Sequence, residues 1–342
     1  MFTLPPPENL KNVSLVCLMA NYNKKQTIEK SIRSVLMQQT NFKYQLIILD
    51  DCSTDGSYEI ALKLAKEFKD KIILLRSKQN EGYLARILEG YSYLKNIPYF
   101  CVLDSDDWYI YPFKFQEAVD FLKNHSDYVC YFAQTYLLKK GEVLNEKDEN
   151  LFQLQHPHYL DFTWQDYQNK KGVFIQTSGC IYKNVYMQKN VPEKLLKFAK
   201  RQDGAMFRGD GFRNPWHMQM GKTHFVNRFE SVYNYDETGL WSQLNLLEQL
   251  KKSLIANFAF FDFFENDIYW LKCAQQSFEK IIGFLKENPE KIKENENFIF
   301  DYFQKIYLTK YTNFNPFEKE KISIQNKNEK KSKVNFKKIL NF

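Results

Sequence analysis

The chain has 342 residues, of which 44% are hydrophobic and 26% are charged, so it is neither a disordered nor a fibrous protein. Its 48 Lys and Arg against 41 Asp and Glu give a formal net charge of +7, which suits contact with phosphate or anionic lipid and argues against a dedicated nucleic-acid-binding protein. The six cysteines are scattered without a CxxC pair, which argues against a structural zinc site and favours reduced thiols in the cytoplasm.

The start of the chain, residues 1–12, has no basic region followed by an apolar stretch, so it predicts a loose lead-in rather than a secretory signal. The most apolar later stretch, 254–271, is interrupted by Asp262, Glu265 and Asp267. No run approaches the roughly 20 uncharged residues of a membrane-spanning helix. We therefore expect a soluble or peripheral protein in the cytoplasm or at the inner face of the cytoplasmic membrane.

Short apolar runs alternate with helical patterns from residue 13 to 138, which predicts β/α units around a mostly parallel sheet. Each run is apolar enough for a strand that is buried on both faces. Apolar residues at helical spacing, as in Ile28, Ile32 and Val35, predict the intervening helices. The expected strands are Val13–Met19, Tyr44–Leu49, Lys71–Leu75 and Tyr99–Leu103.

Longer strand-like runs follow at 127–138, 172–183 and 224–235, separated by a polar loop, 141–150, and a Lys-rich segment near Pro192. They predict an antiparallel extension of the same sheet. After Trp241 the pattern is helical, so we place a domain boundary near residue 245, with a helical region at 246–317. The last residues, 318–342, are rich in Lys and form either a solvated tail or a contact with an anionic membrane.

An acidic cluster, Asp104, Asp106 and Asp107, directly follows the fourth predicted strand. Carboxylates this close together raise one another's pKa unless a cation neutralises them. Mg²⁺ and Mn²⁺ prefer oxygen ligands and often take one or two carboxylates together with phosphate oxygens. The cluster therefore predicts a site for a metal-bound diphosphate, although an acidic turn would contain the same residue types.

Three further side chains are expected near the carboxyl ends of the strands, where ligands of open α/β sheets bind. Asp51 follows the second predicted strand and can accept hydrogen bonds from a base or a ribose, whereas Asp55 reads as the start of the next helix. Tyr22 follows the first strand as a stacking surface for a base, or as a core residue. Arg86 could contact phosphate or carbonyl oxygens, or be an exposed helical arginine.

Taken in order, the segments 13–23, 31–40, 46–57, 80–91 and 102–108 resemble the nucleotide-binding half of the family 2 glycosyltransferases, which have the GT-A fold. The resemblance is strong over 13–115, fainter to about 242, and absent from the last hundred residues. It implies an α/β fold with a mostly parallel sheet flanked by helices, followed here by a C-terminal helical appendage. It also implies a catalytic domain, 13–245, with a nucleotide-binding half, 13–115, and an acceptor half, 116–245.

The resemblance further implies a nucleotide-sugar donor, usually a UDP-sugar, a Mn²⁺ or Mg²⁺ ion, and transfer with inversion. On the family pattern, Asp51 contacts the base, Tyr22 stacks on or borders it, and Arg86 lies near the nucleotide. Asp106 and Asp107 bind ribose and metal, and Asp104 is the first acidic position; which of the three touches the ion stays open. The chain departs from the pattern at Cys52, where Gly or a small polar residue is common, and at Ala20, where Thr or Ser is frequent.

An inverting transfer needs a base opposite the leaving diphosphate. Asp210 resembles the acidic residue of the family motif, with Gly209 in place of the more frequent Glu, and Asp203 is its competitor. The expected acceptor is a glycan or lipid-linked glycan of the bacterial surface. A sugar nucleotidyltransferase and a non-catalytic membrane scaffold are the alternatives.

Two further predictions concern structural roles. His217 and His224 lie near the acceptor segment and read as structural histidines. The Phe-rich stretch 258–264 is too aromatic for a free helix, so it should pack on the catalytic domain, form an oligomer contact, or meet the membrane.

Overall fold

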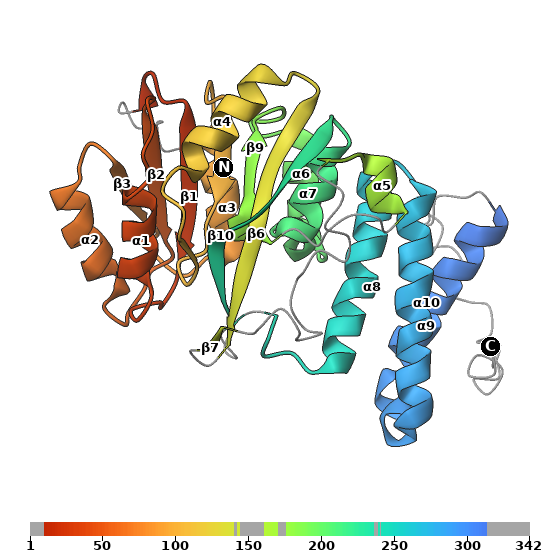
Figure 1. The fold of residues 1–342 in the computed structure, drawn as a ribbon. Helices are drawn as coiled ribbons and strands as arrows, with labels where there is room; N and C mark the ends of the chain where they lie inside the picture. The colour runs from red at the N-terminus through yellow and green to blue at the C-terminus, as the bar shows by residue number, and fades with distance from the viewer. Residues whose placement is uncertain are drawn as a thin grey trace. The chain divides into compact units, whose positions relative to one another are not determined.

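The computed structural model describes residues 10–139, 142–143, 161–169, 176–235, 239 and 241–312, and divides the chain into two compact units, Met1–Glu237 and Thr238–Phe342 (Figure 1). The Lys-rich tail at 318–342, most of the lead-in and most of the loop at 141–150 lie outside the described residues. The two units are considered separately below.

The first unit contains a sheet with the strand order β3-β2-β1-β4-β9-β6-β10-β5, and β7 and β8 pair with β6 and β10 (Figure 1). The first four strands in this order pair in parallel, as predicted. The strands are β1 (Leu15–Asn21), β2 (Tyr44–Asp50), β3 (Ile72–Arg76), β4 (Tyr99–Val102), β5 (Trp108–Tyr109), β6 (Tyr128–Lys139), β7 (Glu142–Val143), β8 (Asp161–Phe162), β9 (Cys180–Lys183) and β10 (Lys222–Tyr235).

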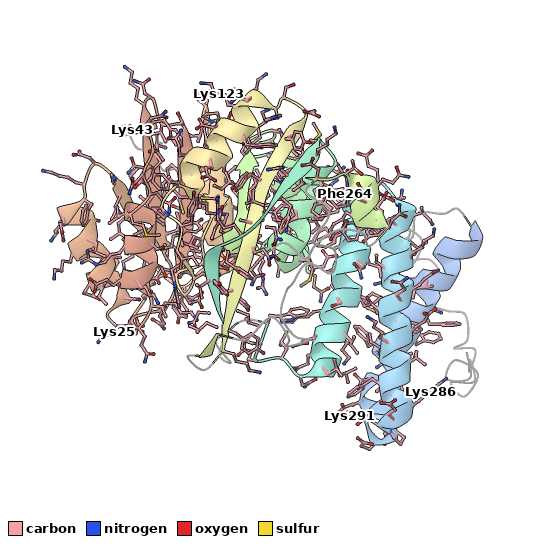
Figure 2. The ribbon with its side chains drawn as sticks, in the orientation of Figure 1. Lys25, Lys43, Lys123, Phe264, Lys286 and Lys291 are labelled. Atoms are coloured by element: carbon pink, nitrogen blue, oxygen red, sulfur yellow. The ribbon has the colours of Figure 1, made fainter. Side chains whose placement is uncertain are left out.

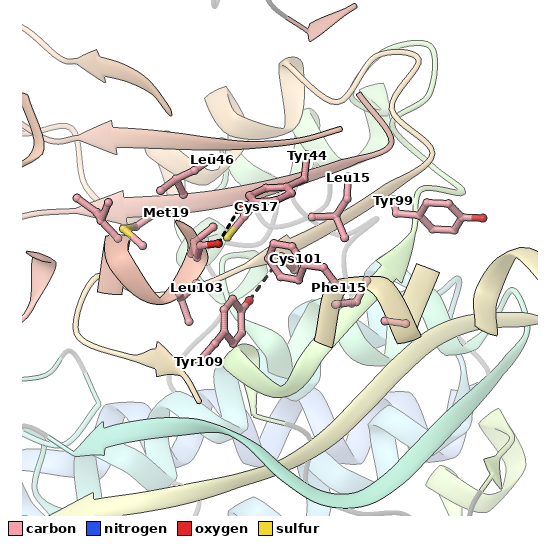
Figure 3. Packing of buried hydrophobic residues seen from close by; sticks show 14 of the residues in the cluster. Leu15, Cys17, Met19, Tyr44, Leu46, Tyr99, Cys101, Leu103, Tyr109 and Phe115 are labelled. Carbon is pink, nitrogen blue, oxygen red and sulfur yellow. Dashed lines mark hydrogen bonds between the residues drawn. The ribbon is translucent and has the colours of Figure 1, made fainter. Parts of the chain in front are cut away.

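Helices cover both faces of the parallel part, because side chains alternate across each strand. Alternate residues of β1, such as Leu15 and Cys17, join a core with α1 (Ile28–Leu36), α2 (Ser57–Glu67) and α4 (Lys114–Asn124) (Figure 3). Within this core the Tyr109 hydroxyl donates a 3.5 Å hydrogen bond to Sγ of Cys101. Helix α3 (Tyr83–Ser92) packs against the opposite face of the sheet. The packing is close at Gly90, because a Cβ atom there would lie only 2.9 Å from a methyl group of Leu49.

The prediction of an antiparallel extension is only partly correct. Strand β9 is antiparallel to β4 and β6, but β10 runs parallel to β6. The reason is that β9, which is antiparallel to β6, returns the chain to the end of the sheet where β6 begins. The chain then passes through α6 (Glu193–Ala199) and α7 (Asp210–Met218), and β10 starts from that end and runs in the direction of β6. The predicted strand at 172–183 is reduced in the described residues to β9, preceded by a 3₁₀ turn, Thr177–Gly179.

The second unit contains the helices α8 (Leu246–Phe263), α9 (Ile268–Glu287) and α10 (Ile292–Thr312). Phe258, Phe260, Phe261 and Phe263 are buried. Three of them contact aromatic side chains of this unit: Phe258 contacts Tyr302, Phe260 contacts Trp270 and Phe263 contacts Phe264. Phe264, labelled in Figure 2, stacks on the same Trp270. The aromatic stretch therefore packs within its own helical unit, an outcome that the three sequence-based alternatives did not include.

None of the helices in the described part of the chain has the length and hydrophobicity to span a lipid bilayer. An oligomer contact through these helices stays a prediction, and the four buried phenylalanines do not supply its surface.

Candidate functional site

The predicted site residues of the first half of the chain lie at one edge of the sheet. Asn21, the last residue of β1, pairs in register with Asp50, the last residue of β2, and Leu18 pairs with Val102 of β4. The segments that leave these three strands therefore begin side by side. They contain Tyr22, Asp51 and the acidic cluster.

Asp51 is 3% exposed and is fixed by the loop between β3 and α3. Its carboxylate accepts hydrogen bonds from the backbone amides of Glu81, at 2.8 Å, and Gly82, at 2.7 Å, and from the Ser77 hydroxyl at 3.1 Å. Gly82 has a φ of +86°, a conformation that glycine adopts without steric cost. The acceptor atoms of Asp51 are thus held in place before any ligand binds.

The residues on either side of Asp51 support the turn. Cys52 has a φ of +62°, which favours glycine and accounts for the small residue usual at this position of the family pattern. Asp55 accepts a 2.9 Å hydrogen bond from the amide of Ser57, the first residue of α2, as the prediction of a helix start requires. These contacts are structural and leave Asp51 as the ligand candidate.

Arg86 is not an exposed helical arginine, because only 4% of it is exposed. Its guanidinium forms ion pairs with Glu81 and with Glu89, the latter at 2.6 Å, and its Nε lies 3.6 Å from a carboxylate oxygen of Asp51. Burial is the main cause of a raised pKa for Glu89, and the Arg86 charge opposes it. Arg86 therefore joins the Asp51 loop to α3.

Tyr22 is 46% exposed, which excludes the alternative that it belongs to the core. It directly follows Asn21, whose amide donates hydrogen bonds to Asp50 at 2.8 Å and to Ser53 at 3.1 Å. The backbone that carries Tyr22 is therefore anchored while its ring stays accessible. This is the placement that a stacking surface needs.

Each carboxylate of the acidic cluster has its own partner. Asp104 accepts a 2.7 Å hydrogen bond from the Tyr83 hydroxyl, and Asp106 lies 2.7 Å from Nζ of Lys24. Asp107 is 1% exposed and accepts a 3.0 Å hydrogen bond from the amide of Asn234, near the end of β10. The cluster thus joins the segments after β1 and β4 to α3 and β10.

The electrostatics of this cluster suit a bound cation. Burial, followed by the charge of Asp106, raises the pKa of Asp104 to about 6. Burial and the charges of Asp106 and Asp104 also raise the pKa of Asp107 well above its usual range. Such shifts show that negative charge is costly here, and a divalent ion would reduce that cost.

The chemistry of these oxygen donors fits Mg²⁺ or Mn²⁺. No group of three or more His, Cys, Asp or Glu side chains in the described ranges is arranged to hold a metal ion. This leaves a site with one or two carboxylates, completed by ligand oxygens or water, as is common for Mg²⁺. Asp106, with 20% of its side chain exposed, is more accessible than Asp107.

The two candidate bases differ in their surroundings. Asp210, the first residue of α7, accepts hydrogen bonds from the Thr177 hydroxyl at 3.1 Å and from the amide of Gly211 at 2.7 Å. Asp203 is held by Arg201 through two contacts, at 2.9 and 2.8 Å. The pKa of Asp104 is raised mainly by burial and by the charge of Asp106, and the charge of Asp210 makes a smaller contribution in the same direction. This effect relates Asp210 to the acidic cluster.

Three residues of this neighbourhood were not predicted: Lys24, Tyr83 and Arg213. Arg213 lies fully buried on α7 and donates hydrogen bonds to the Tyr91 hydroxyl at 3.2 Å and the Thr177 hydroxyl at 3.4 Å. The sequence places Arg213 three residues after Asp210, a spacing that brings two side chains to the same face of a helix. This spacing alone could not identify Arg213 as a site residue, because an exposed arginine would show it too.

The histidines are structural, as expected. Burial lowers the pKa of His217 to about 3, and its ring contacts Tyr182 and Tyr186. His224 pairs with Asp161 at 2.8 Å and stacks on Phe121. Nδ1 of His217 also lies 2.8 Å from the Arg213 carbonyl oxygen, a hydrogen bond within α7.

Comparison with known proteins relates the chain to sugar-transferring proteins. The model of the family "Glycosyl transferase family 2" matches residues 16–189. The putative glycosyltransferase EpsE of Bacillus subtilis is 33% identical over 111 residues, which cover 32% of this chain and 39% of EpsE. The putative teichuronic acid biosynthesis glycosyltransferase TuaG, also of B. subtilis, is 26% identical over 126 residues, which cover 37% of this chain and 48% of TuaG.

This chain spans less than two thirds of the length of these relatives. Among solved structures, S. aureus TarS 1–349 in complex with UDP-GlcNAc is similar, with a TM-score of 0.57 and 12% identity. The likeness covers 86% of this chain and 81% of that one. It confirms the fold expected from the sequence, a helix-flanked, mostly parallel sheet followed by helices.

Proposed function

Because this chain belongs to glycosyltransferase family 2, we propose that it moves a sugar from a nucleotide-diphosphate donor, a UDP-sugar, to a hydroxyl group of a glycan or glycolipid acceptor, with inversion. The observation that carries the proposal is that Asp51 and the acidic cluster follow neighbouring strands at one edge of the sheet. The contribution of the Asp210 charge to the raised pKa of Asp104 supports a place for Asp210 near the cluster. The names of TuaG, in teichuronic acid biosynthesis, and of TarS with UDP-GlcNAc support a bacterial surface glycan as acceptor and a UDP-sugar as donor.

The donor side would use the first half of the site. Asp51 has carboxylate oxygens that can accept the imide N–H of uracil, and the exposed ring of Tyr22 can stack on the base. Arg86 holds the loop that carries the Asp51 contacts. Asp104 and Asp106 supply acceptors for the ribose hydroxyls.

The acidic cluster would also hold the metal ion. Asp106 and Asp107 are the proposed ligands, and Asp104 is the further candidate. When bound, Mg²⁺ or Mn²⁺ screens the negative charge of the diphosphate. Asn234 keeps Asp107 in place through its amide, and Tyr83 does the same for Asp104 through its hydroxyl.

The transfer itself needs a base on the acceptor side. Asp210 takes the proton of the acceptor hydroxyl as that oxygen forms its bond to the anomeric carbon, while the bond from that carbon to the diphosphate oxygen breaks and UDP leaves. The proposed catalytic part is 13–245, with its acceptor half at 116–245. Contact of the tail at 318–342 with an anionic membrane would bring the protein to lipid-linked acceptors.

The test is a screen for UDP release from a panel of UDP-sugars with Mn²⁺, with and without oligosaccharide and lipid-linked acceptors. The configuration of the product is read by NMR. We expect Asp210→Asn to lower the turnover by about 10²- to 10⁴-fold, the usual contribution of a general base. Asp203→Asn is the matched control.

Full activity of Asp210→Asn together with loss in Asp203→Asn would assign the base to Asp203 instead. Release of pyrophosphate from a nucleoside triphosphate and a sugar phosphate would favour a nucleotidyltransferase. Tight UDP binding without turnover on any donor would favour a non-catalytic scaffold.

A further inference from the structure

The Thr177 hydroxyl lies between the candidate base and a buried arginine. Nη2 of Arg213 donates a 3.4 Å hydrogen bond to Oγ1 of Thr177, and this hydroxyl donates a 3.1 Å hydrogen bond to Oδ2 of Asp210. Arg213 and Asp210 lie on α7, whereas Thr177 belongs to the 3₁₀ turn before β9. The three residues therefore connect the start of α7 to the sheet.

The direction of these bonds is set by chemistry. A guanidinium can only donate, so the Thr177 oxygen is the acceptor of the first bond, and its single proton is available for Asp210. The other carboxylate oxygen of Asp210 accepts the 2.7 Å bond from the Gly211 amide. Each oxygen thus has one fixed partner and one lone pair left for an incoming hydroxyl, so the carboxylate has a set orientation.

Burying the positive charge of Arg213 costs free energy unless that charge interacts favourably with other groups. Arg213 has no exposed surface, Thr177 is 7% exposed, and no carboxylate in the described part of the chain forms an ion pair with Arg213. Its remaining bonds go to neutral oxygens, the Tyr91 hydroxyl and the Arg208 carbonyl. A buried cation without a paired anion normally destabilises a fold.

Arg213 reaches Asp210 through a single hydroxyl group. Its Nη2 donates to Oγ1 of Thr177, and this hydroxyl donates to Oδ2 of Asp210. The buried charge is therefore one hydrogen-bonded group away from the candidate base.

We propose that Thr177 and Arg213 are positioning residues for Asp210: Arg213 orients the Thr177 hydroxyl, and this hydroxyl holds the Asp210 carboxylate toward the acceptor. This inference rests on the proposed function, in which Asp210 is the base. Neither residue contacts the reacting atoms, so both act through Asp210.

The test compares Thr177→Val, which keeps the shape and removes the hydroxyl, with Thr177→Ser, which keeps the hydroxyl. The substrate is the UDP-sugar with the fastest UDP release in the screen above, and the control is Thr223→Val, a fully buried threonine on β10. We expect Thr177→Val to lower kcat about tenfold, the order set by one hydrogen bond to a charged group. The donor KM and the UDP affinity should match those of Thr223→Val.

We expect Thr177→Ser to restore kcat to within about threefold of the unsubstituted protein, because a hydroxyl bond is recovered. In an Asp210→Asn background, Thr177→Val should change kcat by less than about twofold, since coupled residues are not additive. An equal loss in the Ser and Val variants, a loss of UDP affinity in Thr177→Val, or a further tenfold loss in the Asp210→Asn background would each overturn the inference.

The same measurements separate the two proposals. Full turnover of Asp210→Asn would remove the base assignment and, with it, the proposed role of Thr177. Loss of turnover in Asp210→Asn with an unchanged Thr177→Val would leave the base in place and reject only the positioning role.

Discussion

The Tyr83 hydroxyl donates a 2.7 Å hydrogen bond to Oδ1 of Asp104, which ties the first residue of α3 to the acidic cluster. Burial and the charge of Asp106 raise the pKa of Asp104 to about 6, and this hydrogen bond opposes them because it favours the ionised carboxylate. Ligand binding that needs the ionised form of Asp104 should therefore weaken as the pH falls through about 6.

Replacing Tyr83 with Phe tests this relationship. Loss of the hydrogen bond raises the pKa of Asp104 further, so the midpoint of Mn²⁺-dependent UDP binding should move to higher pH by about one unit. Calorimetric titrations between pH 5.5 and 8 would measure it, with Tyr58→Phe on α2 as control. Identical midpoints for all three proteins would show that Asp104 does not control binding.

Metal dependence is the second prediction, and it centres on Asp106. Removal of divalent ions with a chelator should abolish UDP binding, and added Mn²⁺ should restore it. Asp106→Asn should lower the Mn²⁺ affinity on the order of tenfold or more, as the loss of a group around a metal commonly does. Electron paramagnetic resonance of free Mn²⁺ measures the affinity, and Asp70→Asn, on the surface, is the matched control. UDP binding that is indifferent to the chelator would contradict the metal assignment.

The third prediction concerns a buried ion pair beneath the site. Lys114 and Glu230 are both fully buried, and Nζ of Lys114 lies 3.1 Å from the Glu230 carboxylate and 2.9 Å from the Gly179 carbonyl oxygen. Lys114→Met should lower the free energy of unfolding by about 3 kcal/mol, because it leaves a buried carboxylate with less compensation. Urea denaturation measures the change.

Lys123→Met, on the exposed side of the same helix, is the control for this pair (Figure 2). The double variant Lys114→Met with Glu230→Gln should recover part of the stability, since it removes both charges. Arg228 also forms an ion pair with Glu230, at 2.5 Å. A Lys114→Met protein as stable as Lys123→Met would show that Arg228 alone neutralises Glu230.

The fourth prediction is a loss of stability in mild acid that depends on His217. Its pKa is lowered to about 3 by burial, whereas an unfolded histidine titrates near 6.5. The unfolded chain therefore takes up a proton that the folded chain does not, so this stabilisation is complete above pH of about 6.5 and is lost by about 1.4 kcal/mol per unit as the pH falls toward 3.

His217→Phe, which keeps a ring among its aromatic neighbours, should flatten this slope. Urea denaturation at pH 7, 6 and 5 would reveal it as a difference between variants, because other groups titrate equally in each. His125→Phe, at an exposed position, should leave the slope unchanged. Parallel pH dependences for all three proteins would disprove the role of His217.

The parallel half of the fold could be predicted because its signals are local. Strands β1, β2 and β4 are continuous apolar runs, and the residue after each run had to lie at the same sheet edge. For this reason the sequence also predicted the neighbourhood of Tyr22, Asp51 and the acidic cluster. The family resemblance added the roles, which remain predictions.

The rest depends on contacts between distant segments. Strand β10 runs parallel to β6 because the antiparallel strand β9 comes between them in the chain, and strand patterns do not encode which strands become neighbours in the sheet. The sequence does not distinguish a buried arginine from an exposed one, and only the packing of α7 in the structure shows that Arg213 is buried. The packing of the Phe-rich stretch could not be predicted either, because its partners Tyr302 and Trp270 lie in other helices.

The bond from the Asn234 amide to Asp107 has a consequence for biosynthesis. Ribosomes deliver β1 to β4 first, yet the acidic cluster gains this amide only after β10 has been made and added to the sheet. A nascent chain that ends at residue 189, where the family match ends, contains neither Asn234 nor Asp210. A chain of that length therefore lacks one hydrogen bond to Asp107, so the acidic cluster should reach its final geometry only after the whole first unit has been made.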